Sequence, residues 1–378
     1  MVEHNTKADK VHIVWCSPHP THYNAYLFDH LVEIKTIDFD AVYFSKTLTK
    51  YPWKRVIESK YRVTYLQKFL GIDWTFIWNR LTASNELLVI AGWNEPTALI
   101  LALCFALTGQ KFILYSDTPE LKERKGLKFW LRKFILRFLF KKTFKFFVTG
   151  KQGLINAELI GVPQCKLINL PFATNIDFFV PIPAEQKDQY AIHFISSGRL
   201  DNSHKAYDIA IEAFERLKKQ FPQYNFHYSL AGDGPDKNKL ESLIKAKGLQ
   251  KEVSLLGWLE AVDLLPFYQS GDVFLHPSHF DPFPNAVLEA MACGLPVIGS
   301  NAAGSVLDRV VDGESGYIHQ DNSVPDLFQK LSWMCNQPIE GRLLMGKKAR
   351  EMAELWSVSY HTRVIEGVVH DYKKEMSC

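Results

Sequence analysis

Short apolar runs alternate along the chain with longer segments in which apolar residues recur every three or four positions. Short runs bounded by polar or turn residues are typical of buried strands, and the longer periodic segments are typical of helices. The strands predicted in the first half are VHIVWC at 11–16, AVYF at 41–44, LLVIAG at 87–92, KFILYS at 111–116 and FKFFVTG at 144–150. Glu95-Pro96 begins a predicted apolar helix that reaches Gly109, because proline is tolerated in a first helical turn.

A second series of the same kind begins at Ala191, after a segment at 175–189 that contains two prolines. Its predicted strands lie in IHFISSGRL (192–200), FHYSLAGDG (226–234), VSLLGW (253–258), DVFLHPS (272–278), PVIGS (296–300) and GYIH (316–319), with helices at 206–221 and 236–248 and another starting near Pro284. Strands that alternate with helices predict parallel α/β units. We therefore expect two doubly wound α/β domains that face each other across a central cleft, with a ligand at the carboxyl ends of the strands. One large sheet is the alternative, which the chain length disfavours.

The composition narrows the class of protein. Of 378 residues, 47% are hydrophobic and 22% are charged, which excludes a disordered chain. The net charge of +3 is too small to indicate a general nucleic-acid binder. Residues 122–145 are the exception, because they hold ten Lys or Arg and a single acid, Glu123, so the rest of the chain sums to −6.

The basic segment 122–145 is rich in aromatic residues as well as in cations. On a helix, Lys133, Arg137 and Lys141 form one row, while Trp130 and Leu139 lie on adjoining faces. This pattern is typical of an interfacial helix on an anionic membrane. A buried helix with a solvated face is the alternative, and RNA binding is a third. The predicted membrane contacts are Lys128, Trp130, Arg132, Lys133, Arg137 and Lys141.

The cysteines and apolar runs indicate the compartment. The six cysteines are far apart and form no CxxC pair, which is typical of reduced, cytosolic cysteine. The run at 11–16 is too short for a signal peptide, and the longest apolar stretch, 97–107, is well below the ~20 residues that span a bilayer. We therefore expect a cytoplasmic protein, peripheral on the inner face of the membrane and not integral to it.

Two carboxylates mark the most informative stretch of the chain. Asp281 and Glu289 are eight residues apart, and Pro284 is placed to start a helix between them. Glu289 then lies on the second turn, with its side chain directed toward the helix start. The N–H groups of a helix start bind phosphate, so this turn offers carboxylates for sugar hydroxyls and a cradle for a diphosphate. A loop acid and a solvated helix acid are the alternative.

The stretch resembles the family 4 glycosyltransferases, whose signature is Ser, two residues, Glu-Gly-Phe, and a second Glu eight residues after the first. Here the matching positions are Ser278, Asp281-Pro282-Phe283-Pro284-Asn285, Glu289, Ala292-Cys293-Gly294-Leu295-Pro296-Val297 and Gly304. Further elements in family order are Gly198-Arg199-Leu200, Lys205, Ala231-Gly232-Asp233-Gly234-Pro235, Gly257-Trp258 and Asp312-Gly313-Glu314-Ser315-Gly316. The resemblance covers roughly residues 175 to 330, and six elements occur in order at suitable distances.

The resemblance implies a GT-B fold and a retaining glycosyltransferase that moves a hexose-type sugar from a nucleoside diphosphate to a hydroxyl of a glycan or lipid-linked acceptor. It implies an acceptor-binding domain at 1–175, a linker at 176–189, a nucleotide-sugar domain at 190–356 and a final helix at 357–378 that crosses back to the first domain. A UDP-sugar is favoured over a GDP-sugar, and polysaccharide biosynthesis is the expected setting. A nucleotide-sugar epimerase and a catalytically degenerate nucleotide-sugar binder are the alternatives.

The resemblance also implies roles for the site residues. Arg199 and Lys205 hold the donor diphosphate, Glu289 binds the ribose and Asp281 binds the donor sugar. The remaining donor-binding positions are Gly198, Gly232, Asp233, Gly234, Trp258, Leu259, Phe283, Asn285 and Ala286. For Gly232 and Gly234, a tight turn is as good an interpretation as close approach of a ligand. Because the Arg199 and Lys205 cations face the diphosphate, no metal or other cofactor is expected.

Two residues depart from the family pattern. Asp281 stands where the family has Glu, and Pro282 stands where it has Gly. The first change shortens the carboxylate by one methylene, and the second removes an amide donor. We expect altered selectivity for the donor sugar.

The first half matches the family less well. The loop after the first strand lacks the family's glycine pair and contains His19, His22 and Asn24, each of which is a candidate acceptor ligand or a structural residue. Trp93 and Asp117 follow two further strands at the same expected edge; Trp93 is an acceptor-side candidate and Asp117 a catalytic one. Asp38-Phe39-Asp40 has the DxD pattern of a metal-diphosphate site in another transferase fold, but it lies within a predicted strand and we interpret it as a chance match.

Overall fold

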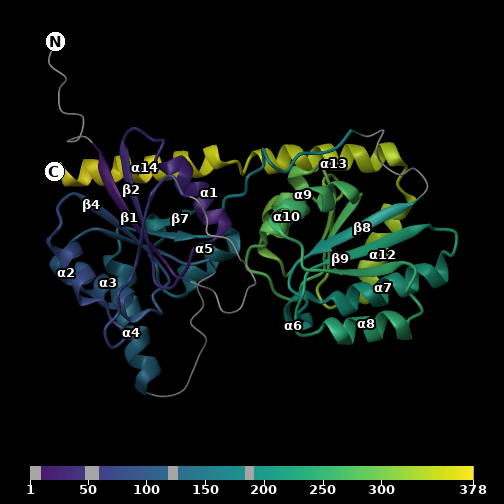
Figure 1. Ribbon diagram of the computed structural model, residues 1–378, viewed down its shortest axis with the longest axis horizontal. Helices are drawn as coiled ribbons and strands as arrows, with labels where there is room; N and C mark the ends of the chain where they lie inside the picture. Colours follow the sequence, from purple (N-terminus) through teal and green to yellow (C-terminus); the bar gives the residue numbers. More distant parts are fainter. Residues whose placement is uncertain (1–9, 47–58, 118–126, 184–190, 378) are drawn as a thin grey trace, which may run out of the picture. The chain divides into compact units, whose positions relative to one another are not determined.

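The computed structural model describes residues 10–46, 59–117, 127–183 and 191–377. The chain divides into two compact units. Residues 1–173 and 358–378 form the first unit, and residues 174–357 form the second. Figure 1 shows a sheet with flanking helices in each unit.

The first unit is built on a seven-stranded sheet in the order β3-β2-β1-β4-β5-β6-β7, in which every neighbouring pair is parallel. The strands are β1 (Val11–Ser17), β2 (Ile37–Tyr43), β3 (Arg62–Tyr65), β4 (Glu86–Ala91), β5 (Phe112–Tyr115), β6 (Lys145–Val148) and β7 (Leu167–Asn169). All five strands predicted for this half are confirmed. This order, in which the chain winds outward from a central strand in both directions, is that of a doubly wound fold.

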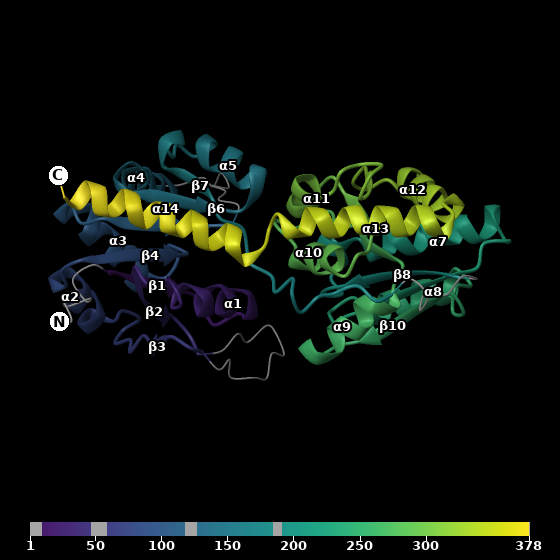
Figure 2. The same cartoon turned by 90° about the horizontal axis from the view of Figure 1, so that it is seen from above.

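Helices cover both faces of the first sheet. The helices of this unit are α1 (His22–Leu31), α2 (Trp74–Thr82), α3 (Pro96–Thr108), α4 (Leu127–Lys142), α5 (Gly150–Leu159), the short 3-10 helix Gln164–Lys166 and α14 (Val358–Met376). The side chains of α1 and α14 pack in one core around Trp15, and those of α2, α3, α4 and α5 pack in another. Figure 2 shows α14 lying along the sheet.

The start and end of α3 follow from local sequence. Glu95 is the N-cap and accepts a hydrogen bond from the Ala98 amide at 2.8 Å, while Pro96 occupies the first turn. Gly109 ends the helix with φ +76, a conformation that glycine adopts without strain. The predicted helix is therefore confirmed at both ends.

The second unit is built on a six-stranded parallel sheet in the order β10-β9-β8-β11-β12-β13. The strands are β8 (Ile192–Ser197), β9 (Phe226–Ala231), β10 (Val253–Gly257), β11 (Val273–His276), β12 (Val297–Ser300) and β13 (Gly316–His319). The helices are α6 (Asn202–Lys205), α7 (Tyr207–Gln220), α8 (Lys237–Ala246), α9 (Ala261–Ser270), α10 (Asn285–Ala292), α11 (Gly304–Arg309), α12 (Val324–Asn336) and α13 (Ile339–Glu354). Two cores lie on opposite faces of this sheet, one under α7, α8 and α12 and the other under α9, α10, α11 and α13. The second predicted α/β domain is confirmed.

Part of the segment expected as a linker packs on the second unit. Ile176 and Phe179 are buried in the core that also holds α10. Arg350 donates hydrogen bonds to the carbonyl oxygens of both residues, at 2.9 and 2.8 Å. The apolar side chains of NIDFFV explain this packing, because leaving them in water would cost free energy. Residues 184–190 lie outside the described part of the chain.

Candidate functional site

Two glycine turns interlock at the carboxyl ends of β8 and β9. Gly232 has φ +145, and a Cβ there would lie 1.8 Å from the carbonyl oxygen of Gly198. A Cβ on Gly234 would lie 2.4 Å from the carbonyl oxygen of Leu200. Only a shift of the backbone could relieve either contact, because both partners are backbone atoms. These glycines are therefore required by the packing of one loop against the next.

Lys205 and Asp281 form an ion pair across the same edge of the sheet. Lys205 is the last residue of α6, which follows β8, and Asp281 lies in the loop after β11. The Lys205 ammonium contacts Oδ2 of Asp281. Nε2 of His276 lies 3.3 Å from the same oxygen and 3.0 Å from the hydroxyl of Ser278. Two cationic or donor groups of the protein thus hold the Asp281 carboxylate.

The environment of Asp281 favours its ionised form. Burial opposes ionisation, but the charge of Lys205 and the hydrogen bond from His276 outweigh it and lower the pKa of Asp281 to about 2. Burial also lowers the pKa of His276. The prediction that Asp281 binds sugar hydroxyls is thereby modified, since one carboxylate oxygen is engaged by protein groups. His276 is a site residue that the sequence analysis missed.

Glu289 lies on the second turn of α10, as the sequence predicts, and has a protein partner. The hydroxyl of Tyr268 donates a hydrogen bond to its Oε2 at 2.7 Å, and the hydroxyl of Ser197 lies 2.7 Å from that of Tyr268. Burial raises the pKa of Glu289. The chain of contacts links the end of β8 through α9 to α10, so it fixes the carboxylate relative to the glycine turns. Tyr268 also escaped the sequence analysis, because it lies within an ordinary apolar helical pattern.

The first turn of α10 begins directly after the loop that carries Asp281. Pro284 is the N-cap of α10, and Asn285 is its first helical residue. Phe283 is buried, and Asn285 and Ala286 are the first helical residues. The start of α11 also holds this loop in place, because the Gly304 amide donates a hydrogen bond to the Asp281 carbonyl at 3.0 Å. The start of this eight-residue helix presents amides suited to an anion.

The remaining donor-side candidates lie at the ends of neighbouring strands. The Gly232 amide donates to the Gly257 carbonyl at 2.7 Å, so the β9 and β10 ends are joined just before Trp258. Trp258 is 37% exposed, while Leu259 packs against the core. The Arg199 side chain is 41% exposed, and its Nε lies 4.0 Å from Asp201.

The candidates of the second unit therefore gather at one edge of its sheet. Asp233 adds its carboxylate there and accepts a hydrogen bond from the Gly234 amide at 2.8 Å. Two cationic residues, two half-buried carboxylates and a helix start are the elements that a nucleoside diphosphate and a sugar require.

Known proteins resemble the chain in both sequence and structure. Residues 181–352 match the family described as Glycosyl transferases group 1. The crystal structure of Anabaena HepE in complex with UDP matches with a TM-score of 0.73 at 16% identity, covering 96% of this chain and 100% of that one. Sucrose-phosphate synthase from Thermosynechococcus elongatus matches with a TM-score of 0.72 at 18% identity, covering 97% of this chain and all of that one.

The fold is GT-B.

Curated relatives match shorter segments. A putative colanic acid biosynthesis glycosyltransferase of Escherichia coli is 28% identical over 203 residues, which is 52% of this chain and 49% of the relative. An alpha-monoglucosyldiacylglycerol synthase of Acholeplasma laidlawii is 34% identical over 113 residues, which is 30% of this chain and 27% of that protein. The chain thus spans about half the length of the first relative and about a quarter of the second.

In the first unit of this GT-B chain, several candidates lie at the carboxyl edge of the sheet. His19 follows β1 and is half-buried, which lowers its pKa. His22 and Asn24 lie in the first turn of α1, where the Asn24 amide donates to the Thr21 hydroxyl at 3.3 Å. Asp117 is exposed after β5, and its carbonyl accepts hydrogen bonds from the Thr149 amide and hydroxyl at 2.9 and 2.8 Å.

Trp93 does not present its ring to the surface, contrary to the prediction of an acceptor ligand. Its side chain is only 9% exposed, and its ring centre lies 5.6 Å from that of Phe140 and 5.8 Å from that of Phe146. The indole is therefore a core residue, packed among the apolar side chains of α3, α4 and the sheet. Its neighbour Asn94 accepts a hydrogen bond from Arg132 of α4.

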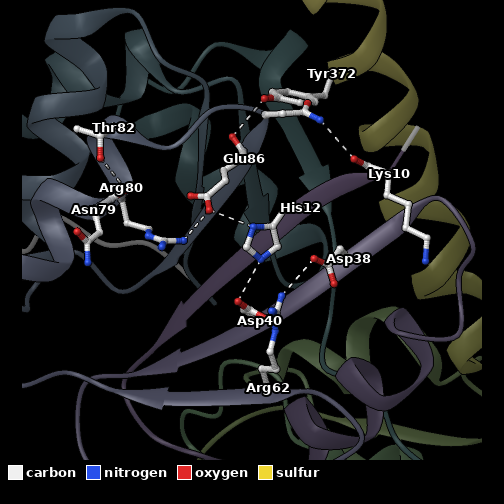
Figure 3. Close-up of polar contacts among 11 residues, drawn as sticks. Lys10, His12, Asp38, Asp40, Arg62, Asn79, Arg80, Thr82, Glu86 and Tyr372 are labelled. Atoms are coloured by element: carbon white, nitrogen blue, oxygen red, sulfur yellow. Dashed lines mark hydrogen bonds and ion pairs between the residues drawn. The ribbon is translucent and has the colours of Figure 1, made fainter. Parts of the chain in front are cut away.

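The Asp38-Phe39-Asp40 pattern lies within β2, and both carboxylates have protein partners. Arg62 on the adjacent strand binds Oδ2 of Asp38 at 3.2 Å and Oδ1 of Asp40 at 2.6 Å. His12 lies between Asp40 and Glu86 (Figure 3). These charges balance one another across four strands, which explains the pattern without a ligand. In the part of the chain described, no three His, Cys, Asp or Glu side chains gather as a metal site would require.

Residues 127–142 of the basic segment form α4, and the two halves of this helix differ. Trp130 is 64% exposed near the helix start, whereas Leu136 and Leu139 are fully buried in the core. The second half of the helix therefore packs in the core as the alternative of a buried helix expects, while the first half exposes its aromatic ring. Arg132, Arg137 and Lys141 are exposed, Lys133 lies over the Trp130 ring, and the side chain of Lys128 lies outside the described structure. Of the helices described, none is both long and apolar enough to cross a bilayer.

Proposed function

We propose that this chain is a glycosyltransferase that moves a hexose-type sugar from a nucleoside diphosphate to a hydroxyl group with retention of the anomeric configuration. The observation that carries the proposal is the joint placement of Lys205, Asp281 and Glu289 around the first turns of α10. The match of residues 181–352 to Glycosyl transferases group 1 supports it.

The proposed donor site assigns one role to each group. Lys205 and Arg199 offset the charge of the diphosphate and stabilise it as the leaving group forms. Glu289, held by Tyr268, accepts hydrogen bonds from the ribose hydroxyls. The amides of Phe283, Asn285 and Ala286 bind the diphosphate at the start of α10, and the backbone at Trp258 and Leu259 contacts the base. A UDP-sugar is the proposed donor, which is supported by the UDP bound in HepE.

The reaction is proposed to proceed on one face of the sugar. The acceptor hydroxyl attacks from the side on which the diphosphate leaves, and the departing phosphate oxygen takes the hydroxyl proton. The C1–O bond to the diphosphate breaks as the new glycosidic bond forms, so atoms and charge balance without a covalent enzyme intermediate. Asp117, His19, His22 and Asn24 are the proposed acceptor-side groups. Neither a metal nor another cofactor is proposed.

The proposed acceptor is a glycan or a lipid-linked saccharide at an anionic membrane surface. The cations and exposed Trp130 of residues 122–145 support this proposal, as does a relative named for a glucosyldiacylglycerol product. The proposed location is the inner face of the cytoplasmic membrane.

A donor screen tests the proposal. The full chain is incubated with UDP- and GDP-sugars and a lipid-linked acceptor, with and without EDTA, and the products are resolved by mass spectrometry. Transfer that survives EDTA supports the proposal. An epimerised donor without transfer indicates an isomerase, and donor binding without reaction indicates a non-catalytic binder; either result overturns it.

Variants at the donor site provide the matched test. Lys205→Ala and Glu289→Ala are each expected to weaken UDP binding at least tenfold, because each removes a charge-assisted contact. Lys239→Ala is the control, since Lys239 is an exposed residue of α8 whose ammonium pairs with Asp236. If both site variants bind UDP as the wild type does, the proposed site is wrong.

A further inference from the structure

Large apolar side chains are exposed on both sides of the junction between β4 and α3 in the first unit. On one side they belong to a turn and to the start of α2, and on the other side they belong to the start of α4. We call these six residues the apolar rim: Phe69 (73% exposed), Leu70 (88%), Trp74 (57%), Trp130 (64%), Leu131 (59%) and Phe134 (73%). Exposed apolar residues that cluster in this way typically mark an interaction surface, whereas single exposed apolar residues do not.

The two halves of the rim are attached to two adjacent residues, one half to each. Lys68, next to Phe69, forms an ion pair with Glu95 at 3.0 Å. Arg132, next to Leu131, donates a hydrogen bond to the Asn94 side chain. Asn94 and Glu95 are adjacent at the carboxyl end of β4, so the two halves flank the edge of the sheet that carries the acceptor-side candidates.

The turn that carries Leu70 is built to expose it. Phe69 and Ile72 exchange backbone hydrogen bonds at 2.9 and 3.1 Å, which closes a two-residue turn. Leu70 has φ +50 and Gly71 has φ +83, so a leucine occupies a left-handed position that asparagine or glycine adopts more readily. In water, neither the strained backbone nor the exposed side chain of this leucine contributes to stability. Insertion of the turn tip into an apolar phase would bury the side chain.

The charges around the rim identify its partner. None of the three helices α2, α3 and α4 contains Asp or Glu, whereas α4 alone carries six Lys or Arg within its sequence LKFWLRKFILRFLFKK. Arg132, Arg137 and Lys141 are exposed. A surface with cations, aromatic residues and no acids on its helices complements anionic lipid headgroups and the acyl boundary beneath them.

We propose that the apolar rim inserts into an anionic membrane through both of its halves, and that it holds the carboxyl end of β4 against the bilayer so that a lipid-borne acceptor reaches this edge. The inference rests on the proposed function for the acceptor class. It adds to the basic helix a second insertion element, the Phe69–Ile72 turn, which carries no cluster of charge of its own.

Vesicle sedimentation of the full chain tests the proposal. The wild type is expected to pellet with phosphatidylglycerol-containing vesicles and much less with pure phosphatidylcholine. Leu70→Asn is the central variant, because asparagine suits φ +50 and should keep the melting temperature at or above that of the wild type. It is expected to reduce the partition coefficient about tenfold, and Trp130→Ser with Phe134→Ser is expected to do the same or more.

Leu107→Asn is the matched control. Leu107 is 76% exposed at the other end of α3, roughly 17 Å along the helix from the junction. Unchanged vesicle binding by Leu70→Asn, or an equal loss with Leu107→Asn, overturns the proposal, as does failure of the wild type to pellet. UDP binding is measured on the same samples, so a failed donor site and a failed membrane site are distinguished.

Discussion

The guanidinium carbon of Arg309 lies 4.4 Å from the centre of the Phe283 ring and 5.1 Å from that of Trp356. Arg309 is completely buried, and within the described residues none of its three guanidinium nitrogens has a hydrogen-bond partner. Burial lowers its pKa to about 9. The two rings are therefore its main favourable contacts, and they connect this cation to the loop that precedes α10.

Two replacements of Arg309 distinguish the effect of its buried charge on stability from the effect of its stacking between the two rings. Arg309→Met keeps an extended side chain between the rings and removes a desolvated charge, whereas Arg309→Lys keeps a compact, strongly hydrated charge that stacks poorly. We expect the Lys variant to be less stable than the Met variant by about 2 kcal/mol, measured by urea unfolding. Equal stability of the two variants would show that the charge is not desolvated.

Tyr268→Phe removes the hydrogen bond to Glu289 without changing the shape of the buried ring. Loss of the hydroxyl leaves Oε2 of Glu289 without this donor, at a cost of about 1 to 2 kcal/mol. UDP affinity, measured by calorimetry, is expected to fall about tenfold because the carboxylate is no longer held in place. Tyr224→Phe serves as the control, since Tyr224 bonds Asn336 away from the site. An unchanged UDP affinity in Tyr268→Phe would contradict the positioning role.

The Lys205–Asp281 ion pair predicts a pH dependence of stability. The pKa of Asp281 falls from its ordinary 3.8 to about 2 in the folded chain, so its contribution is present above about pH 4 and is lost as the pH falls through 2. Asp281→Asn is expected to lower the free energy of unfolding by about 2 kcal/mol at pH 7, and the difference should shrink toward zero near pH 2. Urea unfolding at several pH values measures it; a difference that stays constant with pH would exclude the ion pair as its source.

His12 predicts the opposite trend in the first unit. Hydrogen bonds to Asp40 and Glu86 raise its pKa from 6.5 to about 9, so its stabilising contribution is complete below pH 6.5 and is lost as the pH rises through 9. His12→Gln is expected to be about 3 kcal/mol less stable than the wild type at pH 6, with the difference narrowing by pH 9.5. His227→Gln, at an exposed position, controls for loss of a histidine. A gap that widens at high pH would contradict the charge assignment.

Gly232→Ala tests the interlocked turns. The added methyl group would meet the Gly198 carbonyl at 1.8 Å, a contact that only a backbone shift can relieve. We expect a loss of several kcal/mol in stability and no detectable UDP binding. Gly248→Ala is the control, because a Cβ there meets nothing within 4 Å although its φ is also positive at +66. Comparable losses in the two variants would point to backbone strain alone as the cause.

Much of the fold was predictable because its signals are local. The long apolar strands such as β1 and β4 were identified from their runs, and α3 was bounded by Glu95-Pro96 and Gly109. The strands β3 and β7 were missed, since RVTY and LIN are short and contain no run of buried residues. Such edge strands are defined by their pairing with a neighbouring strand. A short stretch of sequence does not indicate that pairing.

The sequence by itself determined the two α/β series, the glycine turns and the acid spacing around α10, because apolar periodicity, backbone freedom and helix geometry are properties of neighbouring residues. Only the tertiary structure decided which groups meet. Lys205 and Asp281 are 76 positions apart, and Tyr268 and Glu289 are 21 apart, yet parallel strands bring their ends to one edge. The burial of Trp93 and Leu139 and the attachment of the two halves of the apolar rim to the adjacent residues Asn94 and Glu95 were likewise set by packing between elements, for which the chain carries no local signal.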